Sequence, residues 1–431
     1  MRMRNRKRKP ENGRNAGGGL RRIVRWTEVL RTTSLQRIVS RRAALRQPIS
    51  RRRTRRQSKL WRLILRRTTL HQFGLQRAVS QLTALFLAMA LLLTGCGAGA
   101  EREADRLQVG LVYYNENDTF LTELLSCFGD EISALQDSTE SVNKKGGSRP
   151  QASLTVRTGA MAQRTEDRRV EELLEAGCNV LCVNLVDRTA PVQIIDMARE
   201  REVPVIFFNR EPVREDLLRW DRLYYIGSDA KEAGTMQGEM AAAAIRTDVR
   251  ADRNRDGRIQ FVVMQGEPGH QDVIVRTENA VRTLQSELQG SGLTLDKLSY
   301  QIANWNRAQA RTKMEQLLQQ YGSTIELVLC NNDDMALGVL DAYDASDMTE
   351  ASRPLIFGTD GTKEGLQAVA DGRLQGTVYQ DKERLAAQMA ALAGVLHAGR
   401  SLAEFDLADG RYLWIPHRKV TPENVSAFFA K

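Results

Sequence analysis

The sequence predicts an α/β protein with two doubly wound parallel-sheet lobes, and three observations support this prediction. From residue 107 onward, short and continuously apolar runs alternate with stretches whose apolar residues recur three and four positions apart. Strands that are apolar throughout are typical of parallel sheets covered by helices on both faces. The region after residue 96 has about 335 residues, enough to bury a large core and to divide into two lobes.

The predicted elements follow one another in regular alternation. Strands are expected at 108–114, 153–158, 179–186, 203–209, 223–229, 259–266, 298–305, 325–332, 354–360 and 376–381. Helices are expected at 119–136, 168–177, 190–201, 233–246, 309–322 and 363–373. The polar segment 136–152 is typical of a surface loop before the second strand.

Several of these strands end in polar residues. The polar ends comprise Asn115, Asn117 and Asp118 after the first strand, the tripeptides 209–211 and 331–333, and Asp360. A single polar strand end is usually a helix cap, and Asp118 or Asp333 alone would need no other role. Because ligands bind outside the carboxyl ends of the strands in such sheets, the set as a whole predicts a binding site.

The formal charge of +10 is concentrated at the start of the chain. Residues 1–80 contain 25 of the 63 Lys and Arg with only two acidic residues, whereas residues 81–431 carry 38 basic and 51 acidic side chains. A nucleic-acid or membrane-surface partner is therefore a hypothesis for the first eighty residues alone. We prefer to interpret this Arg-rich extension as disordered or as an upstream start assignment, and expect no nucleic-acid partner.

An uncharged apolar run at 82–95 precedes Cys96. Fourteen residues are too few to span a bilayer comfortably but suit a signal-peptide core, with a buried helix as the alternative. The end of the run, Leu93-Thr94-Gly95-Cys96, resembles a bacterial lipobox, in which the Cys is lipidated. We therefore expect a lipoprotein signal at 81–96, a linker at 97–106, and a lipid anchor on Cys96 that holds the protein outside the cytoplasmic membrane.

Catalytic signatures are missing from the sequence. It contains no Gly-rich phosphate loop, no G-x-S-x-G and no cluster of His and Cys at zinc spacing. Of the later cysteines, Cys182 and Cys330 lie within apolar strand patterns and are expected to be small buried hydrophobes. The sequence therefore favours binding over catalysis.

The segment 251–263 resembles part of a calcium-binding loop. Asp252, Asn254 and Asp256 stand at alternate positions, but the twelfth position, normally a bidentate Glu, is Val263. The segment after the loop is a predicted strand, so the second helix of an EF-hand sensor is missing. A structural calcium clip and a plain polar turn both remain open at this point.

A set of motifs, in a fixed order, gives the region 107–420 a specific family resemblance. The motifs are "NDTF", "VNLVDR", "FFNREP", "YYIGSD", "DRNRDGRIQ", "GEPGHQDVIVR", "NWNRAQA", "CNNDDMALG", "FGTDG" and "GTVYQD". In these motifs the chain resembles the periplasmic galactose/glucose-binding proteins, the substrate-binding components of sugar ABC transporters. The resemblance implies a type I periplasmic-binding-protein fold with lobes at 107–227 plus 381–412 and at 230–376 plus 415–431. The hinges are implied near 226–230, 377–381 and 413–417.

The resemblance also implies a sugar site. Its residues would be Asp118, Phe120, Asn209, His270, Asp272, Arg276, Trp305, Asn332, Asp360 and Gln380. The chain departs from the family in three places: Gln380 replaces an Asn, Asn306 replaces an Asp, and the 158–169 segment lacks the usual Asn/Gln-rich motif. Aromatic rings match the apolar faces of a pyranose, and planar polar groups pair with adjacent hydroxyls.

For the calcium-like loop, the resemblance implies a structural Ca²⁺ and a distant Glu that replaces the missing one. Its ligands would be Asp252, Asn254, Asp256, the Arg258 backbone carbonyl, Gln260 and Glu326. Carboxylates and neutral oxygens suit this cation.

We therefore expect a non-enzymatic monosaccharide-binding protein that closes on its ligand and delivers it to an ABC transporter permease. A sugar-sensing subunit of a chemoreceptor or sensor kinase is the alternative. Sugar-responsive transcriptional regulators share the fold but begin with a helix-turn-helix, where this chain has a signal core. An enzyme on the same fold is less favoured, because hydroxyl binding already explains the acidic residues.

Overall fold

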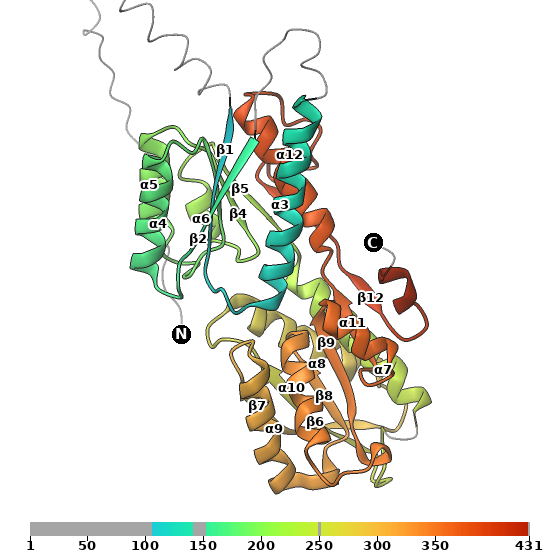
Figure 1. Cartoon of the computed structure of the whole chain (residues 1–431). Helices are drawn as coiled ribbons and strands as arrows, with labels where there is room; N and C mark the ends of the chain where they lie inside the picture. Colours follow the sequence, from blue (N-terminus) through green and yellow to red (C-terminus); the bar gives the residue numbers. More distant parts are fainter. Residues whose placement is uncertain (1–105, 141–151, 249–250, 430–431) are drawn as a thin grey trace, which may run out of the picture. The chain divides into compact units, whose positions relative to one another are not determined.

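The computed structural model describes residues 106–140, 152–248 and 251–429, which belong to one compact unit of the chain, residues 93–431. The Arg-rich extension 1–80, the signal core 81–96 with Cys96, and nearly all of the linker 97–106 lie outside the described residues. Within the described part, the chain forms two six-stranded sheets flanked by helices (Figure 1). The α/β fold class with two parallel-dominated lobes is thus confirmed.

The first sheet has the strand order β11-β5-β4-β3-β1-β2, and all neighbouring strands are parallel. Its strands are β1 (Leu107–Tyr113), β2 (Ala152–Thr158), β3 (Val180–Val183), β4 (Val205–Phe208), β5 (Leu223–Gly227) and β11 (Tyr412–Trp414). The helices of this lobe are α3 (Thr119–Glu140), α4 (Gln163–Glu175), α5 (Val192–Glu200), α6 (Arg214–Leu217) and α12 (Lys382–His397).

Both faces of this sheet are buried, which explains why its strands are continuously apolar. In β3, Cys182 packs with the side chains of α3 and α12, while Leu181 and Val183 pack on the opposite face with those of α4 and α5. Figure 1 shows α3 and α12 side by side along the sheet. Alternate residues of one strand thus enter two different cores.

The second sheet has the order β12-β10-β9-β8-β6-β7, and only its short edge strand β12 runs antiparallel to its neighbour. Its strands are β6 (Arg258–Gln265), β7 (Thr294–Ile302), β8 (Leu327–Cys330), β9 (Leu355–Asp360), β10 (Gly376–Tyr379) and β12 (Arg418–Val420). The helices of this lobe are α7 (Ala230–Thr247), α8 (Gln271–Glu287), α9 (Arg307–Tyr321), α10 (Asp333–Asp344) and α11 (Lys363–Ala370), with 3₁₀ turns η2 (Gly322–Thr324), η3 (Glu350–Ser352) and η4 (Val425–Phe428).

The second sheet is covered in the same way as the first. Leu327 and Leu329 of β8 pack with residues of α7 and α8, whereas Val328 and Cys330 pack with those of α9 and α10. Cys182 and Cys330 are completely buried and unpaired, as predicted for small hydrophobes. Among the described helices, none is both long and apolar enough to cross a membrane.

The chain passes between the two lobes three times. The crossings lie between β5 and α7, between β10 and α12, and between β11 and β12. Since β10 continues to Tyr379 in the second sheet and β11 to Trp414 in the first, the last two crossings, 380–381 and 415–417, are shorter than the hinge ranges that the resemblance implies.

Some predicted boundaries are wrong. The strand expected at 298–305 begins at Thr294 and ends at Ile302, and residues 303–305 turn toward α9. The loop expected at 136–152 starts later, because α3 continues to Glu140. The strands β11 and β12 were not predicted, since three residues are too few to show an apolar period.

Candidate ligand-binding site

A cavity of about 360 Å³, including the part open to solvent, lies where the carboxyl ends of the strands of both sheets meet. All ten residues that the resemblance implies line it, together with Tyr114 and Arg210. From the first lobe come Tyr114, Asp118, Phe120, Asn209 and Arg210, from the second His270, Asp272, Arg276, Trp305, Asn332 and Asp360, and Gln380 lies on a crossing segment. Residues separated by more than 260 positions in the sequence are therefore brought to one place.

Three lining residues have a left-handed backbone conformation that is uncommon for residues other than glycine. The φ angles are 59° at Asn209, 62° at Trp305 and 109° at Asp360. Each of these residues lies at or just after the end of a strand. Such conformations cost free energy and are concentrated at functional sites, where the surrounding structure holds them.

Trp305 is held by contacts on several sides. A Cβ atom added to Gly266 would lie 2.2 Å from the indole ring, so the ring packs directly on the glycine backbone. The imidazole of His270 makes an edge contact with the indole at 5.3 Å between ring centroids. The amide nitrogen of Asn332 donates a hydrogen bond to the Trp305 carbonyl at 3.2 Å. A second aromatic residue of the lining, Phe120, is buried and contacts the core beneath α3.

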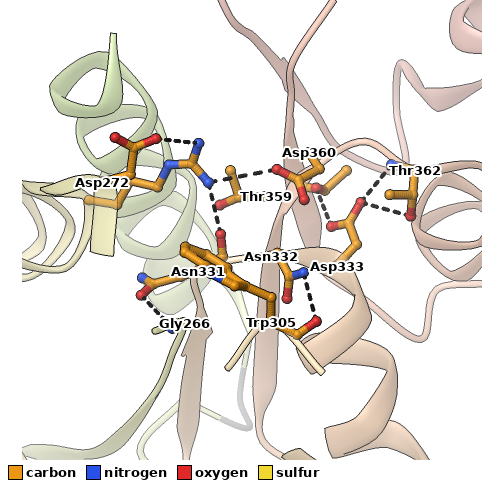
Figure 2. A network of polar contacts seen from close by, with 12 residues as sticks. Gly266, Asp272, Trp305, Asn331, Asn332, Asp333, Thr359, Asp360 and Thr362 are labelled. Atoms are coloured by element: carbon orange, nitrogen blue, oxygen red, sulfur yellow. Dashed lines mark hydrogen bonds and ion pairs between the residues drawn. The ribbon is translucent and has the colours of Figure 1, made fainter. Parts of the chain in front are cut away.

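The guanidinium of Arg276 lies among acceptors from three segments. It donates to the Asn331 carbonyl at 3.1 Å and to Asp272 Oδ2 at 3.4 Å, and it forms an ion pair with Asp360 Oδ1 at 3.6 Å. Figure 2 shows Asp272, Asn331 and Asp360 around this network. Burial raises the pKa of Asp360 well above its usual value, and the nearby Arg276 opposes that increase. The Arg276 guanidinium and the Asp360 carboxyl group thus lie together beside the cavity.

On the first-lobe side of the cavity, Asp118 is held in place by two hydrogen bonds. Asp118 precedes α3 and accepts hydrogen bonds from the Leu121 N–H at 2.9 Å and from the Tyr114 hydroxyl at 2.8 Å. Burial raises the pKa of Asp118, and the Leu121 N–H partly offsets this increase. Asp118 is therefore both a helix cap and part of the cavity lining, so the two roles do not compete.

Arg210 was missed by the sequence analysis as a site residue, as was Tyr114. The guanidinium of Arg210 lies 3.6 Å from the centroid of the Tyr114 ring and donates to the Val186 carbonyl at 2.8 Å. It also forms an ion pair with Glu267 of the other lobe at 2.7 Å. The signal that could have found it is its position directly after Asn209 at a polar strand end.

His270 is an uncharged hydrogen-bonding group. Burial lowers the pKa of its imidazole to about 4, so the ring is neutral near pH 7. Its Nδ1 accepts from the Asp272 N–H at 3.1 Å, which caps α8 and assigns the remaining proton to Nε2. That N–H can donate a hydrogen bond to a ligand.

Four polar atoms of the lining are buried and have no hydrogen-bond partner among the described residues. They are Trp305 Nε1, Arg276 Nε, Arg210 Nε and Gln380 Oε1. Buried polar groups in folded proteins are nearly always paired. Three donors and one acceptor left over in one cavity therefore indicate a ligand that both accepts and donates hydrogen bonds.

The calcium-like loop lies in the second lobe, next to the amino end of β6. Asp252 accepts from the N–H groups of Asp256 and Gly257 at 3.1 and 3.3 Å, and the amide nitrogens of Asn254 and Gln260 donate to Asp256 Oδ2 at 3.0 and 2.8 Å. No three Asp, Glu, His or Cys side chains of the described residues are arranged to hold a metal ion. The loop is closed here by its own hydrogen bonds.

The predicted distant partner of this loop, Glu326, does contact it. Glu326 is buried and accepts from the N–H groups of Arg253 and Gln260 at 2.6 and 3.3 Å. Burial raises the pKa of its carboxyl group. The Oε1 atom of Gln260 is also buried and has no partner within the described part of the chain. The side chains of the loop and Glu326 offer only oxygen ligands, one of them the unpaired buried carbonyl oxygen of Gln260. Oxygen ligands of this kind are the ones that Ca²⁺ binds in proteins.

Two α/β lobes with a polar cavity at the strand ends define a class of two-lobed binding proteins. Residues 109–401 match the family model described as periplasmic binding protein domain, and the chain belongs to this family. The family consists of binding proteins, so the chain is a binding protein rather than an enzyme, and it is extracytoplasmic by family.

Curated relatives and solved structures agree with this assignment. The chain is 31% identical over 350 residues to the D-galactose/methyl-galactoside binding periplasmic protein MglB of Haemophilus influenzae, an alignment that covers 80% of this chain and 98% of that protein. It is 30% identical over 216 residues to the ribose import binding protein RbsB of Bacillus subtilis, covering 50% of this chain and 61% of that protein. An ABC transporter solute binding protein from Bacillus halodurans with bound myo-inositol has the same fold, with a TM-score of 0.59, 24% identity, and coverage of 76% of this chain and 98% of that one.

Proposed function

We propose that the chain binds a monosaccharide, a galactose- or glucose-like hexopyranose, and delivers it to the permease of an ABC transporter. The observation that supports this most is the cavity itself, which combines the aromatic rings of Tyr114, Phe120 and Trp305 with carboxylates, amides, guanidinium groups and four unpaired buried polar atoms. Two of the relatives, a galactose-binding protein and a ribose import binding protein, point to the same ligand class.

The chemistry of a pyranose suits this cavity. Trp305 and Phe120 supply apolar faces for the two C–H faces of the ring. Asp118, Asp272 and Asp360 supply acceptors, Arg276 supplies a donor fork, and all can bind adjacent hydroxyls in pairs. A sugar that lacks one hydroxyl would leave a desolvated polar group unpaired and would be rejected. Gln380, one methylene longer than the family's Asn, bears on the choice among close isomers.

Closure of the two lobes would couple binding to delivery. Several contacts join the lobes in this structure. Among them, Thr119 Oγ1 donates to Asp334 Oδ2 at 2.7 Å, the Lys363 N–H donates to Glu123 at 3.0 Å, and Arg210 pairs with Glu267 at 2.7 Å. A ligand that contacts both lobes favours the form in which these contacts exist. That closed form would present the surfaces of both lobes to the permease.

Thermal unfolding with a panel of monosaccharides tests the ligand class. A ligand that binds only the folded state stabilises it by about 2.7 kcal/mol when the ligand concentration is one hundred times Kd. Such a ligand therefore raises the midpoint temperature of unfolding. We expect galactose or glucose to raise the midpoint of residues 97–431, and Trp305→Ala to remove that increase while Trp220→Phe, outside the cavity, keeps it. A flat response to all hexoses would overturn the sugar assignment.

Delivery to a permease is separable from sensing, because a chemoreceptor or sensor-kinase subunit would use the same cavity and closure. Deletion of the gene is expected to abolish high-affinity uptake of the bound sugar. Normal uptake with a lost chemotactic or transcriptional response would support the sensing alternative instead.

We further propose that the 252–260 loop and Glu326 hold a structural Ca²⁺. The support is the buried Glu326 carboxyl, the unpaired Gln260 Oε1 and the oxygen-only donor set. A chelator is expected to lower the thermal midpoint and leave sugar affinity nearly unchanged, and Glu326→Gln should abolish the effect of the chelator. A large loss of sugar affinity on chelation would contradict a purely structural role.

Lipid anchoring through Cys96 is a separate proposal that rests on the lipobox-like sequence alone. Cys96→Ser is expected to release the protein from the membrane fraction, whereas the unchanged protein should partition into detergent. Release of both forms would contradict the anchor.

A further inference from the structure

Asp360 has an uncommon backbone conformation where it lines the cavity. Its φ angle is 109°, and that of the following Gly361 is 65°, so the chain has two consecutive positive φ angles directly after β9. A Cβ atom added to Gly361 would lie 2.3 Å from the Tyr379 ring. Such a conformation persists only where the surrounding structure holds it. The contacts of the segment 360–363 therefore determine where the Asp360 carboxyl group lies.

The second lobe holds one side of this segment. The Asp333 carboxyl group accepts from the Thr362 N–H at 2.8 Å, and Asp360 Oδ1 pairs with Arg276 at 3.6 Å (Figure 2). Asp333 begins α10 and Arg276 lies in α8, so both partners belong to the same lobe as the segment. Neither contact requires the first lobe.

Two side chains of the first lobe hold the other side of the segment. Lys382, the first residue of α12, donates from Nζ to the Gly361 carbonyl at 3.2 Å. Glu123, in α3, accepts from the Lys363 N–H at 3.0 Å. The two side chains also form an ion pair with each other, at 3.1 Å between Lys382 Nζ and Glu123 Oε2. The first lobe thus contacts the backbone on both sides of Thr362.

The surroundings of this ion pair distinguish it from a solvated surface contact. Lys382 is 8% exposed, its Nζ lies 5.1 Å from the centroid of the Tyr379 ring, and Glu383 Oε1 is a more distant partner at 3.9 Å. The Glu123 carboxylate faces the first N–H of α11, where the helix dipole favours a negative charge. Removal of one partner from a mostly buried pair leaves the other charge uncompensated. Loss of either side chain is therefore expected to loosen the segment.

We propose that Lys382 and Glu123 are positioning residues for Asp360, which hold the segment 360–363 from the first lobe and thereby direct the Asp360 carboxyl group at one sugar hydroxyl in the closed form. Neither of the two residues lines the cavity. The inference rests on the proposed monosaccharide function and deepens it. Recognition of one hydroxyl by the second lobe then depends on side chains of the first lobe that do not contact the ligand.

Isothermal titration with a sugar and its monodeoxy analogues tests the inference. The parent sugar is whichever of D-galactose and D-glucose the unchanged protein binds, and each analogue lacks one hydroxyl. Lys382→Met and Glu123→Gln are each expected to bind the parent sugar about tenfold more weakly than the unchanged protein does. The analogue without the hydroxyl at Asp360 should bind to all three proteins with the same affinity, because that contact is already lost. Competition with the parent sugar measures the weakly bound analogues.

Lys419→Met and Glu239→Gln are the matched controls. They remove an ion pair of 2.6 Å between β12 and α7, within the second lobe and outside the cavity lining, and should leave every affinity unchanged. Unchanged affinity in Lys382→Met and Glu123→Gln would overturn the inference. An equal loss for the parent sugar and every analogue would also overturn it, because the pair would then support closure without positioning Asp360.

The thermal midpoint without sugar shows whether each variant folds. If Lys382→Met does not fold, Glu123→Gln, which keeps the size of the side chain, decides between the same outcomes. If the unchanged protein binds neither galactose nor glucose, the monosaccharide function itself fails. If it binds one of them and the variants bind as it does, only the positioning role fails.

Discussion

At the scale of single residues, Gly266 determines where the indole of Trp305 lies. Any Cβ at this position would lie 2.2 Å from a ring atom, and the Trp305 backbone is itself in the left-handed region. The glycine and the unusual backbone conformation therefore act together to direct the ring toward the cavity. A flexible surface tryptophan would need neither.

Gly266→Ala is expected to displace the Trp305 ring and to weaken sugar binding about tenfold. Overpacking of this kind costs roughly 1–3 kcal/mol, and about 1.4 kcal/mol corresponds to one factor of ten in Kd. The measurement is a sugar titration followed by tryptophan emission. Gly394→Ala, at a position in α12 where an added Cβ meets nothing within 4 Å, is the control and should bind normally. Normal binding by Gly266→Ala would show that the ring has no role in the site.

The residues of the cavity were predictable to different degrees. Asp118, Asn209, Asn332 and Asp360 stand at strand ends that the sequence marks as polar, so chain position alone pointed to them. Arg210 stands at such an end too, but its role depends on Glu267, 57 positions away, which no local pattern reveals. The left-handed turn at Trp305 depends on the space above Gly266, which is likewise a tertiary property.

At the scale of elements, the start of α10 ties neighbouring strands of the second sheet together. Asn332 caps the helix by accepting from the Met335 N–H at 3.0 Å. Asp333, fully buried behind it, accepts from the Thr362 N–H at 2.8 Å and from Thr377 Oγ1 of β10 at 2.6 Å. One carboxyl group thus connects the end of β8 with β10 and with the segment that follows β9.

Stability is expected to depend on the protonation of Asp333. Burial raises the pKa of its carboxyl from 3.8 to about 7, so the folded state holds a proton that the unfolded chain releases. This contribution to the free energy of unfolding is fully present below about pH 3.8 and is lost as the pH rises through about 7. Denaturant unfolding across pH 4–8 should therefore show a fall in stability that is smaller in Asp333→Asn. Asp371→Asn, an exposed control, should keep the slope, and an unchanged slope in Asp333→Asn would contradict the assignment.

The elements themselves were easier to predict than their ends. Continuous apolar runs identified the central strands because both faces of each sheet are covered. The edge strand β7 begins four residues before its predicted start, where its sequence is mixed because edge positions are only partly buried. The short strands β11 and β12 form only through pairing with β5 and β10, which is information from distant parts of the chain.

At the scale of the whole molecule, binding and closure are linked through contacts that join the lobes. The Thr119 hydroxyl and Asp334 meet across the two lobes although they are 215 positions apart. A hydrogen bond to a charged group contributes about 1.5–3 kcal/mol, which here would favour the closed form only.

Thr119→Val is expected to weaken sugar affinity about tenfold, because the closed form loses this contact and the open form does not. Thr122→Val is the matched control: it lies one turn along α3, and its hydroxyl donates to the Asp118 carbonyl at the start of its own helix. Calorimetry gives the affinities, and small-angle scattering follows the closure. Equal affinities in the two variants would show that the contact does not contribute to closure.

We propose above that one hexopyranose binds in the cavity at the strand ends of both lobes. Isothermal titration of the protein with D-galactose and D-glucose tests it most directly, with Trp305→Ala titrated in parallel. We expect one site per chain for at least one of the two sugars and at least tenfold weaker binding in the variant. Absence of binding to both sugars, or equal binding by the variant, would contradict it.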